Sequence, residues 1–235
     1  MTRTLKALSA LLTYPSEDLQ QAAPEIAPLL RAEGLIDAAA LDALAPLLAE
    51  LAERDLFDLQ ERFVLLFDRS RSLSLNLFEH VHGESRDRGQ AMVDLLETYR
   101  AGGYEPVGSE LPDHLPMLVE YLATRPLPEA REMLAEAAHI LTVLAERLER
   151  RESSYAPVLR ALAALAAERA VPELLAELAR QPDDDPEDLA ALDAAWEEAA
   201  VTFGPDPNAG CPAGRDMLAN ISPLEPSPWA AGIRS

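Results

Sequence analysis

Three of the four histidines of the chain lie in two short segments that also carry carboxylates. Residues 76–89 read NLFEHVHGESRDRG and hold His80 and His82, and residues 110–116 read ELPDHLP and hold His114. Imidazole and carboxylate side chains are ligands that zinc and iron use in proteins. On a helix, however, side chains two positions apart do not face each other, so the H-x-H spacing does not close a ligand set. We therefore expect no bound metal, and we expect these side chains to cap helices and bond to nearby backbone groups.

The same segments contain no complete catalytic motif. Residues 83–87 read GESRD, which matches the nucleophile-elbow pattern G-x-S-x-G for three positions and then has Asp87 where glycine is required. Cys211 lies in a Gly- and Pro-rich region without a histidine nearby, and the chain has neither a phosphate loop nor a dinucleotide fingerprint. The pattern favours a protein that is not an enzyme. A small helical metal-dependent hydrolase that uses the histidine segments is an alternative.

The charge of the chain narrows the range of partners. It has 41 acidic and 20 basic residues, a formal net charge of -21. Such a surface repels nucleic-acid phosphates and anionic membranes and attracts basic partners. No apolar run approaches the ~18 residues that a transmembrane helix needs, and the first residues read as an amphipathic helix rather than a signal peptide. We expect a cytoplasmic protein with neither nucleic-acid binding nor direct membrane insertion.

Hydrophobic spacing predicts helices along most of the chain. Apolar residues, chiefly Ala and Leu, recur three and four positions apart, and no segment alternates with period two over the length of a strand. Polar and turn-forming residues separate these stripes: Ser16 and Asp37 read as N-caps, and Gly34 as a helix end. The sequence predicts one all-α domain of roughly nine to eleven helices over residues 1–203.

The character of the sequence changes after Phe203. Residues 204–235 hold ten glycines and prolines and show no sustained periodicity, which indicates an irregular C-terminal tail. The last predicted helix precedes this tail, with Asp185 as its N-cap and Trp196 on its apolar side. We therefore divide the chain into a helical domain, residues 1–203, and an extended tail.

The two histidine segments together resemble known signatures. Residues 76–92 resemble the signature of the dedicated assembly chaperones of respiratory nitrate reductase, the NarJ-type or delta-subunit family. Residues 110–115 resemble the E-x-P-D-H motif of the wider TorD-like family of molybdoenzyme chaperones, with Leu111 at the variable position. Residues 11–15, LLTYP, fit an early motif of the same family. The resemblance covers the helical domain without needing the tail, and it implies an all-helical chaperone of the TorD-like type.

This resemblance implies a function. Proteins of the family bind the N-terminal segment of the apo catalytic (alpha) subunit of nitrate reductase and assist molybdenum cofactor insertion and enzyme assembly, without becoming part of the mature enzyme. It also implies no permanently bound cofactor, only transient contact with molybdenum bis-guanine-dinucleotide through the client. The proteins that synthesise this cofactor are further implied partners. A structural subunit of an oligomeric assembly is the second alternative.

We expect the client to be held as a helix in an apolar groove, with an acidic rim that speeds its encounter with basic client residues. The residues predicted to contact the client peptide come from the two histidine segments, the connection between them and the helix that follows: Phe78, His80, His82, Tyr104, Leu111, Asp113, His114, Leu115, Leu118, Tyr121 and Leu122. The last four are predicted to line the groove. Asp113 is predicted to be the N-cap of their helix, and His114 to be exposed to the client.

Overall fold

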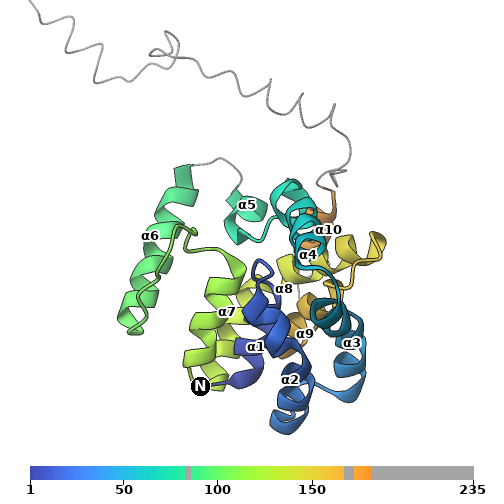
Figure 1. The fold of residues 1–235 in the computed structure, drawn as a ribbon. Helices are drawn as coiled ribbons and strands as arrows, with labels where there is room; N and C mark the ends of the chain where they lie inside the picture. The colour runs from blue at the N-terminus through green and yellow to red at the C-terminus, as the bar shows by residue number, and fades with distance from the viewer. Residues whose placement is uncertain (83–85, 167–171, 181–235) are drawn as a thin grey trace, which may run out of the picture. The chain divides into compact units, whose positions relative to one another are not determined.

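The described part of the protein is built from helices. The computed structural model describes residues 1–82, 86–166 and 172–180, and within these ranges the extended pairing is limited to a bridge between Asn76 and His114 (Figure 1). The helices, including a π-helix η1 and a 3-10 turn η2, are α1 (Arg3–Leu11), α2 (Glu17–Glu33), α3 (Ala38–Glu53), α4 (Leu56–Phe63), η1 (Val64–Asp68), η2 (Arg71–Leu73), α5 (Leu77–His82), α6 (Arg86–Ala101), α7 (Leu115–Thr124), α8 (Leu127–Arg150), α9 (Ala156–Leu165) and α10 (Pro172–Ala179). The predicted all-α class is confirmed.

The described residues all belong to one compact unit. Two sequence predictions, the helix capped by Asp185 and the tail at residues 204–235, lie outside the described residues. The proposed boundary at residue 203 therefore stays a prediction. None of the described helices is both long enough and apolar enough to cross a membrane.

The ends of the early helices follow the predicted caps. The Ser16 side chain accepts a hydrogen bond from the backbone of α2, and Asp37 Oδ1 accepts one from Ala40 N at 2.7 Å at the start of α3. Gly34 ends α2 in the left-handed region with a φ of 67°, which glycine adopts without a steric penalty. Each side-chain cap stabilises its helix by about 1 kcal/mol. Because caps depend on residue type and short spacing, these positions could be located from the sequence.

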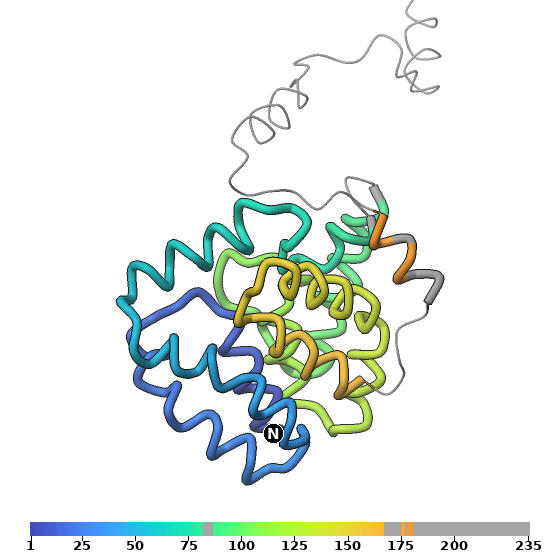
Figure 2. The backbone as a smooth tube through the Cα atoms, turned by 90° about the vertical axis from the view of Figure 1, so that its right-hand side faces the viewer, coloured from blue at the N-terminus to red at the C-terminus, as the bar shows by residue number. Residues whose placement is uncertain are grey.

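Three pairs of helices pack side by side in the core, and the first pair joins distant parts of the sequence. α1 lies along α7, α2 along α3, and α8 along α9 (Figures 1 and 2). Polar contacts fix the first pair, because Thr2 N donates to Ala123 O at 2.7 Å and Ser9 Oγ donates to Pro116 O at 2.7 Å. α7 also packs against α8, so neighbouring helices cover it on more than one side.

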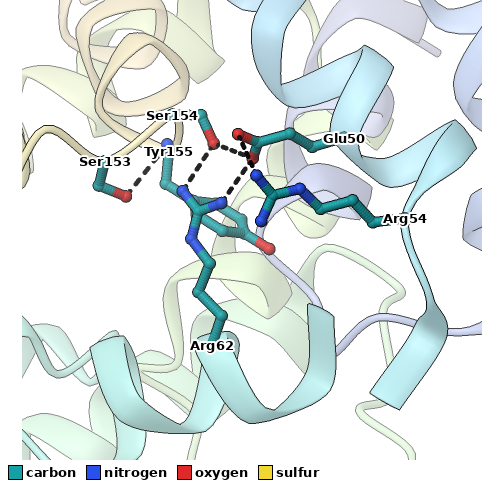
Figure 3. A network of polar contacts seen from close by, with 6 residues as sticks. All are labelled: Glu50, Arg54, Arg62, Ser153, Ser154 and Tyr155. Carbon is teal, nitrogen blue, oxygen red and sulfur yellow. Dashed lines mark hydrogen bonds and ion pairs between the residues drawn. The ribbon is translucent and has the colours of Figure 1, made fainter. Parts of the chain in front are cut away.

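A polar network joins α4 to the core (Figure 3). Arg62 Nη1 lies 2.6 Å from Glu50 Oε2 of α3, and Arg62 Nη2 donates to Ser154 Oγ, in the turn between α8 and α9, at 3.0 Å. Ser154 Oγ donates in turn to Glu50 Oε2 at 2.6 Å, and the Arg62 guanidinium lies over the ring of Tyr155. These partly buried contacts hold α4 against α3 and the turn between α8 and α9.

α4 continues directly into η1, a single π-helical segment in which Arg69 N donates to Val64 O. An apolar stripe at spacings of three and four does not distinguish an α-helix from an α-helix with one widened turn, so the sequence does not reveal η1. Such insertions occur frequently at functional sites.

Candidate functional site

The two histidine segments lie next to each other in the structure. Leu115 N donates to Leu75 O at 2.8 Å, and Leu77 N donates to Asp113 O at 3.1 Å, on either side of the bridge between Asn76 and His114. The start of α5 and the start of α7 are therefore joined backbone to backbone. The sequence predicted that each segment is functional, and the structure brings them together at one junction.

Asp113 caps α5 rather than α7, so the predicted N-cap is wrong. Asp113 Oδ2 accepts a hydrogen bond from Phe78 N at 2.9 Å, 35 positions away in the sequence. At α7 the N-cap is His114, without a side-chain cap, and Pro116 in the first turn has no N–H to offer. The carboxylate that precedes α7 therefore serves another helix.

The buried Asp113 carboxylate is only partly compensated. Asp113 is fully buried, and within the described part of the chain its Oδ1 accepts no hydrogen bond. Burial raises the pKa of this carboxyl group above its usual range, and the hydrogen bond from Phe78 and the positive charge of Arg88 oppose that shift. An incompletely satisfied buried carboxylate costs folding free energy, which indicates that the junction is not optimised for stability alone.

His80 supports the same junction from inside. Its side chain is buried, and its Nε2 lies 2.8 Å from Ser74 O. Burial lowers the pKa of His80 and favours the neutral imidazole, whose Nε2–H donates to this carbonyl. The structure thus confirms the expected bond to nearby backbone for His80. The side chain of His82 lies outside the described residues.

A cluster of three tyrosines ties α6 and the following loop to α7. Tyr99, fully buried, donates through its hydroxyl to Pro112 O at 2.7 Å. The centroid of its ring lies 4.8 Å from that of Tyr121 and 5.7 Å from that of Tyr104. The sequence showed Tyr99 only as one member of a helical stripe, so its role at the loop that carries the second histidine segment was missed.

The four side chains predicted to line a groove belong to the core. Leu115 and Leu122 have no exposed surface, and Tyr121 and Leu118 are 2% and 6% exposed. α1 and α8 cover the faces of α7 that a groove would need. The predicted surface groove is therefore wrong for this structure, and a client contact at these positions would require the core to open.

His114 is half-buried instead of fully exposed, so the prediction for its surroundings needs correction. Burial lowers its pKa, while the negative charges of Glu110, Asp113 and Asp68 act in the opposite direction. Asp68, at the end of η1, has its own pKa raised by burial and by Glu110. His114 thus lies among three carboxyl groups contributed by two different parts of the chain.

Apolar side chains around the junction are accessible on α5, on α6 and on the loop between α6 and α7. Leu111 is 44% exposed, and Phe78 and Tyr104 are half-buried. Three valines that the sequence analysis did not select, Val81, Val93 and Val107, are exposed as well, with Val107 at 94%. A valine in a polar loop was the sequence signal that could have identified Val107. We name Phe78, Val81, Tyr104, Val107 and Leu111 the junction surface.

The described residues contain no group of three or more His, Cys, Asp or Glu side chains placed to hold a metal ion. The side chains of His82 and Glu84 are not described, so this statement does not cover them. The expectation of no bound metal therefore stays a prediction.

Comparisons with known proteins give a consistent match. A family model described as Nitrate reductase delta subunit matches residues 16–161. The Nitrate reductase molybdenum cofactor assembly chaperone NarJ of Escherichia coli (strain K12) is 45% identical over 210 residues, which cover 88% of this chain and 87% of that protein. The "Probable nitrate reductase molybdenum cofactor assembly chaperone NarJ" of Bacillus subtilis (strain 168) is 31% identical, over 68% of this chain and 86% of its own. A solved crystal structure from Archaeoglobus fulgidus is 25% identical with a TM-score of 0.48, and the match covers 68% of this chain and 90% of that one.

Proposed function

Because this chain belongs to the nitrate reductase delta subunit family, we propose that it is an assembly chaperone for the catalytic subunit of a nitrate reductase. The similarity to a chaperone of this name over 88% of the chain is the observation that carries the proposal. The family match spans residues 16–161 and so includes both histidine segments. The family consists of assembly chaperones rather than catalysts, which speaks against the hydrolase alternative.

The proposed client segment is the N-terminus of the apo catalytic subunit. The junction surface supports a contact of this kind, because it offers apolar side chains on a short helix and on a loop that α7 anchors. An amphipathic client helix would place its apolar side on these residues. The net charge of -21 favours basic residues on its polar side.

The chaperone role includes the molybdenum cofactor only through the client. The E. coli relative is named for molybdenum cofactor assembly, and we extend that role to this chain without a cofactor of its own. Any contact with the cofactor would then be transient and made while the client is bound. The proteins that synthesise the cofactor are proposed as further partners, and the cytoplasm as the place of action.

The test is binding of the full chain to a peptide with the N-terminal sequence of the client. Leu111→Asp places a charge on the junction surface at an exposed position, so we expect at least about tenfold weaker binding with an unchanged melting temperature. Ala22→Asp is the matched control, because it adds the same charge at an exposed position of α2. Equal affinity of the two variants would remove the junction surface from the proposal. No binding of the wild-type chain to apo catalytic subunit would contradict the chaperone role itself.

A further inference from the structure

A second accessible apolar surface lies on α4 and η1, elements that contribute nothing to the junction surface. It is a hollow of about 300 Å³, at the lower end of the range for small-molecule pockets. Phe57, 77% exposed, and Tyr14, 52% exposed, stand at its edge. Because these rings remain in contact with solvent, the hollow cannot enclose a small molecule, and a protein surface is the better fit.

The lining residues of α4 and η1 recur at helical spacing. They are Phe57, Gln60, Glu61, Val64, Leu65 and Arg69. They form four levels about one turn apart: Phe57, then Gln60 with Glu61, then Val64 with Leu65, then Arg69. The hollow therefore follows the helix axis for about 18 Å at 1.5 Å per residue. An exposed face of this length and spacing accommodates a second helix of about three turns, whose side chains pack between its ridges.

The hollow is preformed. The Tyr14 ring packs edge-on against Phe63 at a centroid distance of 5.8 Å, and Gln60 Nε2 donates to Pro15 O at 2.9 Å. Arg62, with its contacts to Glu50 and Ser154, fixes α4 to the core (Figure 3). An occupant would therefore bind without first ordering this surface, which lowers the entropic cost of association.

The lining of the hollow includes two charged side chains, Glu61 and Arg69. In the described ranges neither Glu61 nor Arg69 has an ion-pair partner, although both line the hollow. They stand about two turns apart, with Val64 and Leu65 between them. A complementary surface therefore carries apolar residues in the middle, a basic residue at one end and an acidic residue at the other.

We infer that this hollow is a docking site for an amphipathic helix of a partner protein, with a basic residue facing Glu61 and an acidic residue facing Arg69. The site is separate from the junction surface and can be occupied together with it. The inference does not depend on the identity of the client proposed above.

Photo-crosslinking tests the inference in cells that contain the full chain. Phe57→p-benzoylphenylalanine places the reactive group at the hollow, and Ala22→p-benzoylphenylalanine is the control on exposed α2. We expect the first variant alone to crosslink to one protein segment, and mass spectrometry to show apolar residues flanked by opposite charges two turns apart. A crosslink to a segment without this pattern, to a second copy of this chain, or no specific crosslink overturns the inference.

Charge reversal gives a second, quantitative test. Glu61→Arg should lower the crosslinking yield at Phe57 at least fivefold, and reversal of the facing basic residue of the identified segment should restore it. Leu111→Asp should leave the yield unchanged, because it changes only the junction surface. Loss of the crosslink in Leu111→Asp would show that the hollow is not an independent site. If the crosslink persists and Leu111→Asp has no effect on client binding, the hollow is upheld and only the junction surface is removed from the proposed function. If the crosslink persists and the wild-type chain does not bind apo catalytic subunit, the hollow is upheld and the proposed function is contradicted.

Discussion

α6 and α7 read alike in the sequence and differ sharply in the structure. Both carry apolar stripes at helical spacing, yet α7 is buried over almost its whole length, whereas Tyr99 is the single buried one among the described side chains of α6. α7 has one charged residue in ten, Glu120, and α1 and α8 cover it. α6 packs beside α5 and keeps its charged face in solvent (Figure 1). A helix that is apolar on all sides becomes core, so the stripe alone does not identify a binding surface.

The largest expected effect separates the two helices by stability. Leu122→Ala removes a fully buried side chain of α7, and we expect it to lower the free energy of unfolding by about 3 kcal/mol. Leu96→Ala removes a half-exposed side chain of α6 and should cost about 1 kcal/mol or less. Urea unfolding of both variants measures the difference. Equal costs would show that α7 is no more part of the core than α6.

Removal of the Asp113 carboxylate tests which helix it caps. Asp113→Ala leaves Phe78 N without its acceptor, so we expect a loss of about 1 kcal/mol, as for Asp37→Ala at α3. Hydrogen exchange should accelerate at the Phe78 amide in α5 and stay unchanged at Leu118 in α7. Faster exchange at Leu118 alone would show that Asp113 caps α7, as the sequence predicted.

The buried His80 should make stability depend on pH. Burial lowers the pKa of His80 in the folded state below the unfolded value of 6.5. Between these two pKa values the unfolded chain binds a proton at His80 and the folded chain does not, which favours unfolding. The contribution of His80 is fully present above the unfolded pKa and declines as the pH falls from 6.5 toward the lower folded-state pKa. His80→Gln keeps a donor for Ser74 O without titrating, so unfolding between about pH 7.5 and pH 5.5 should show a flatter decline. An identical slope in both proteins would place His80 in contact with solvent.

Salt should act on association with the client more than on dissociation. Exposed charges are screened within about 8 Å at physiological ionic strength, so the net charge of -21 steers encounter without holding the complex. We expect association of the client peptide to slow several-fold from low to moderate salt in stopped-flow measurements, with little change in dissociation. Leu111→Asp should instead accelerate dissociation and change association little. Dissociation that accelerates steeply with salt would show that charge, and not the junction surface, retains the client.

The positions that could be predicted were those set by local chemistry. Ser16, Gly34 and Asp37 define helix ends through contacts with residues only a few positions away, and the structure confirms all three. The candidate site was found as two segments, because three of the four histidines lie in them beside carboxylates. The pairing of Asn76 with His114 could not be predicted, since it depends on the path of the chain between them.

Each error has a physical reason. Asp113 stands where an N-cap is expected, but the first turn of α7 contains Pro116, which has no N–H, and the carboxylate accepts from Phe78 N of a distant segment. η1 left no trace in the apolar spacing, because one widened turn barely shifts the stripe. For Asp113, a contact with a distant residue decided between two possible caps.

The sequence by itself determined the helical class, the caps of the early helices, the charge and the family, because each depends on residue type and short spacing. Only the tertiary structure decided which apolar stripe is core and which is accessible, since burial depends on what packs against a helix. The accessible apolar residues were predicted on α7, but in the structure they lie on α5, on α6 and on the loop before α7. The hollow beside Phe57 was also visible only in the structure. Each surface combines residues that at least one helix separates in the sequence, and no local pattern predicts that they meet.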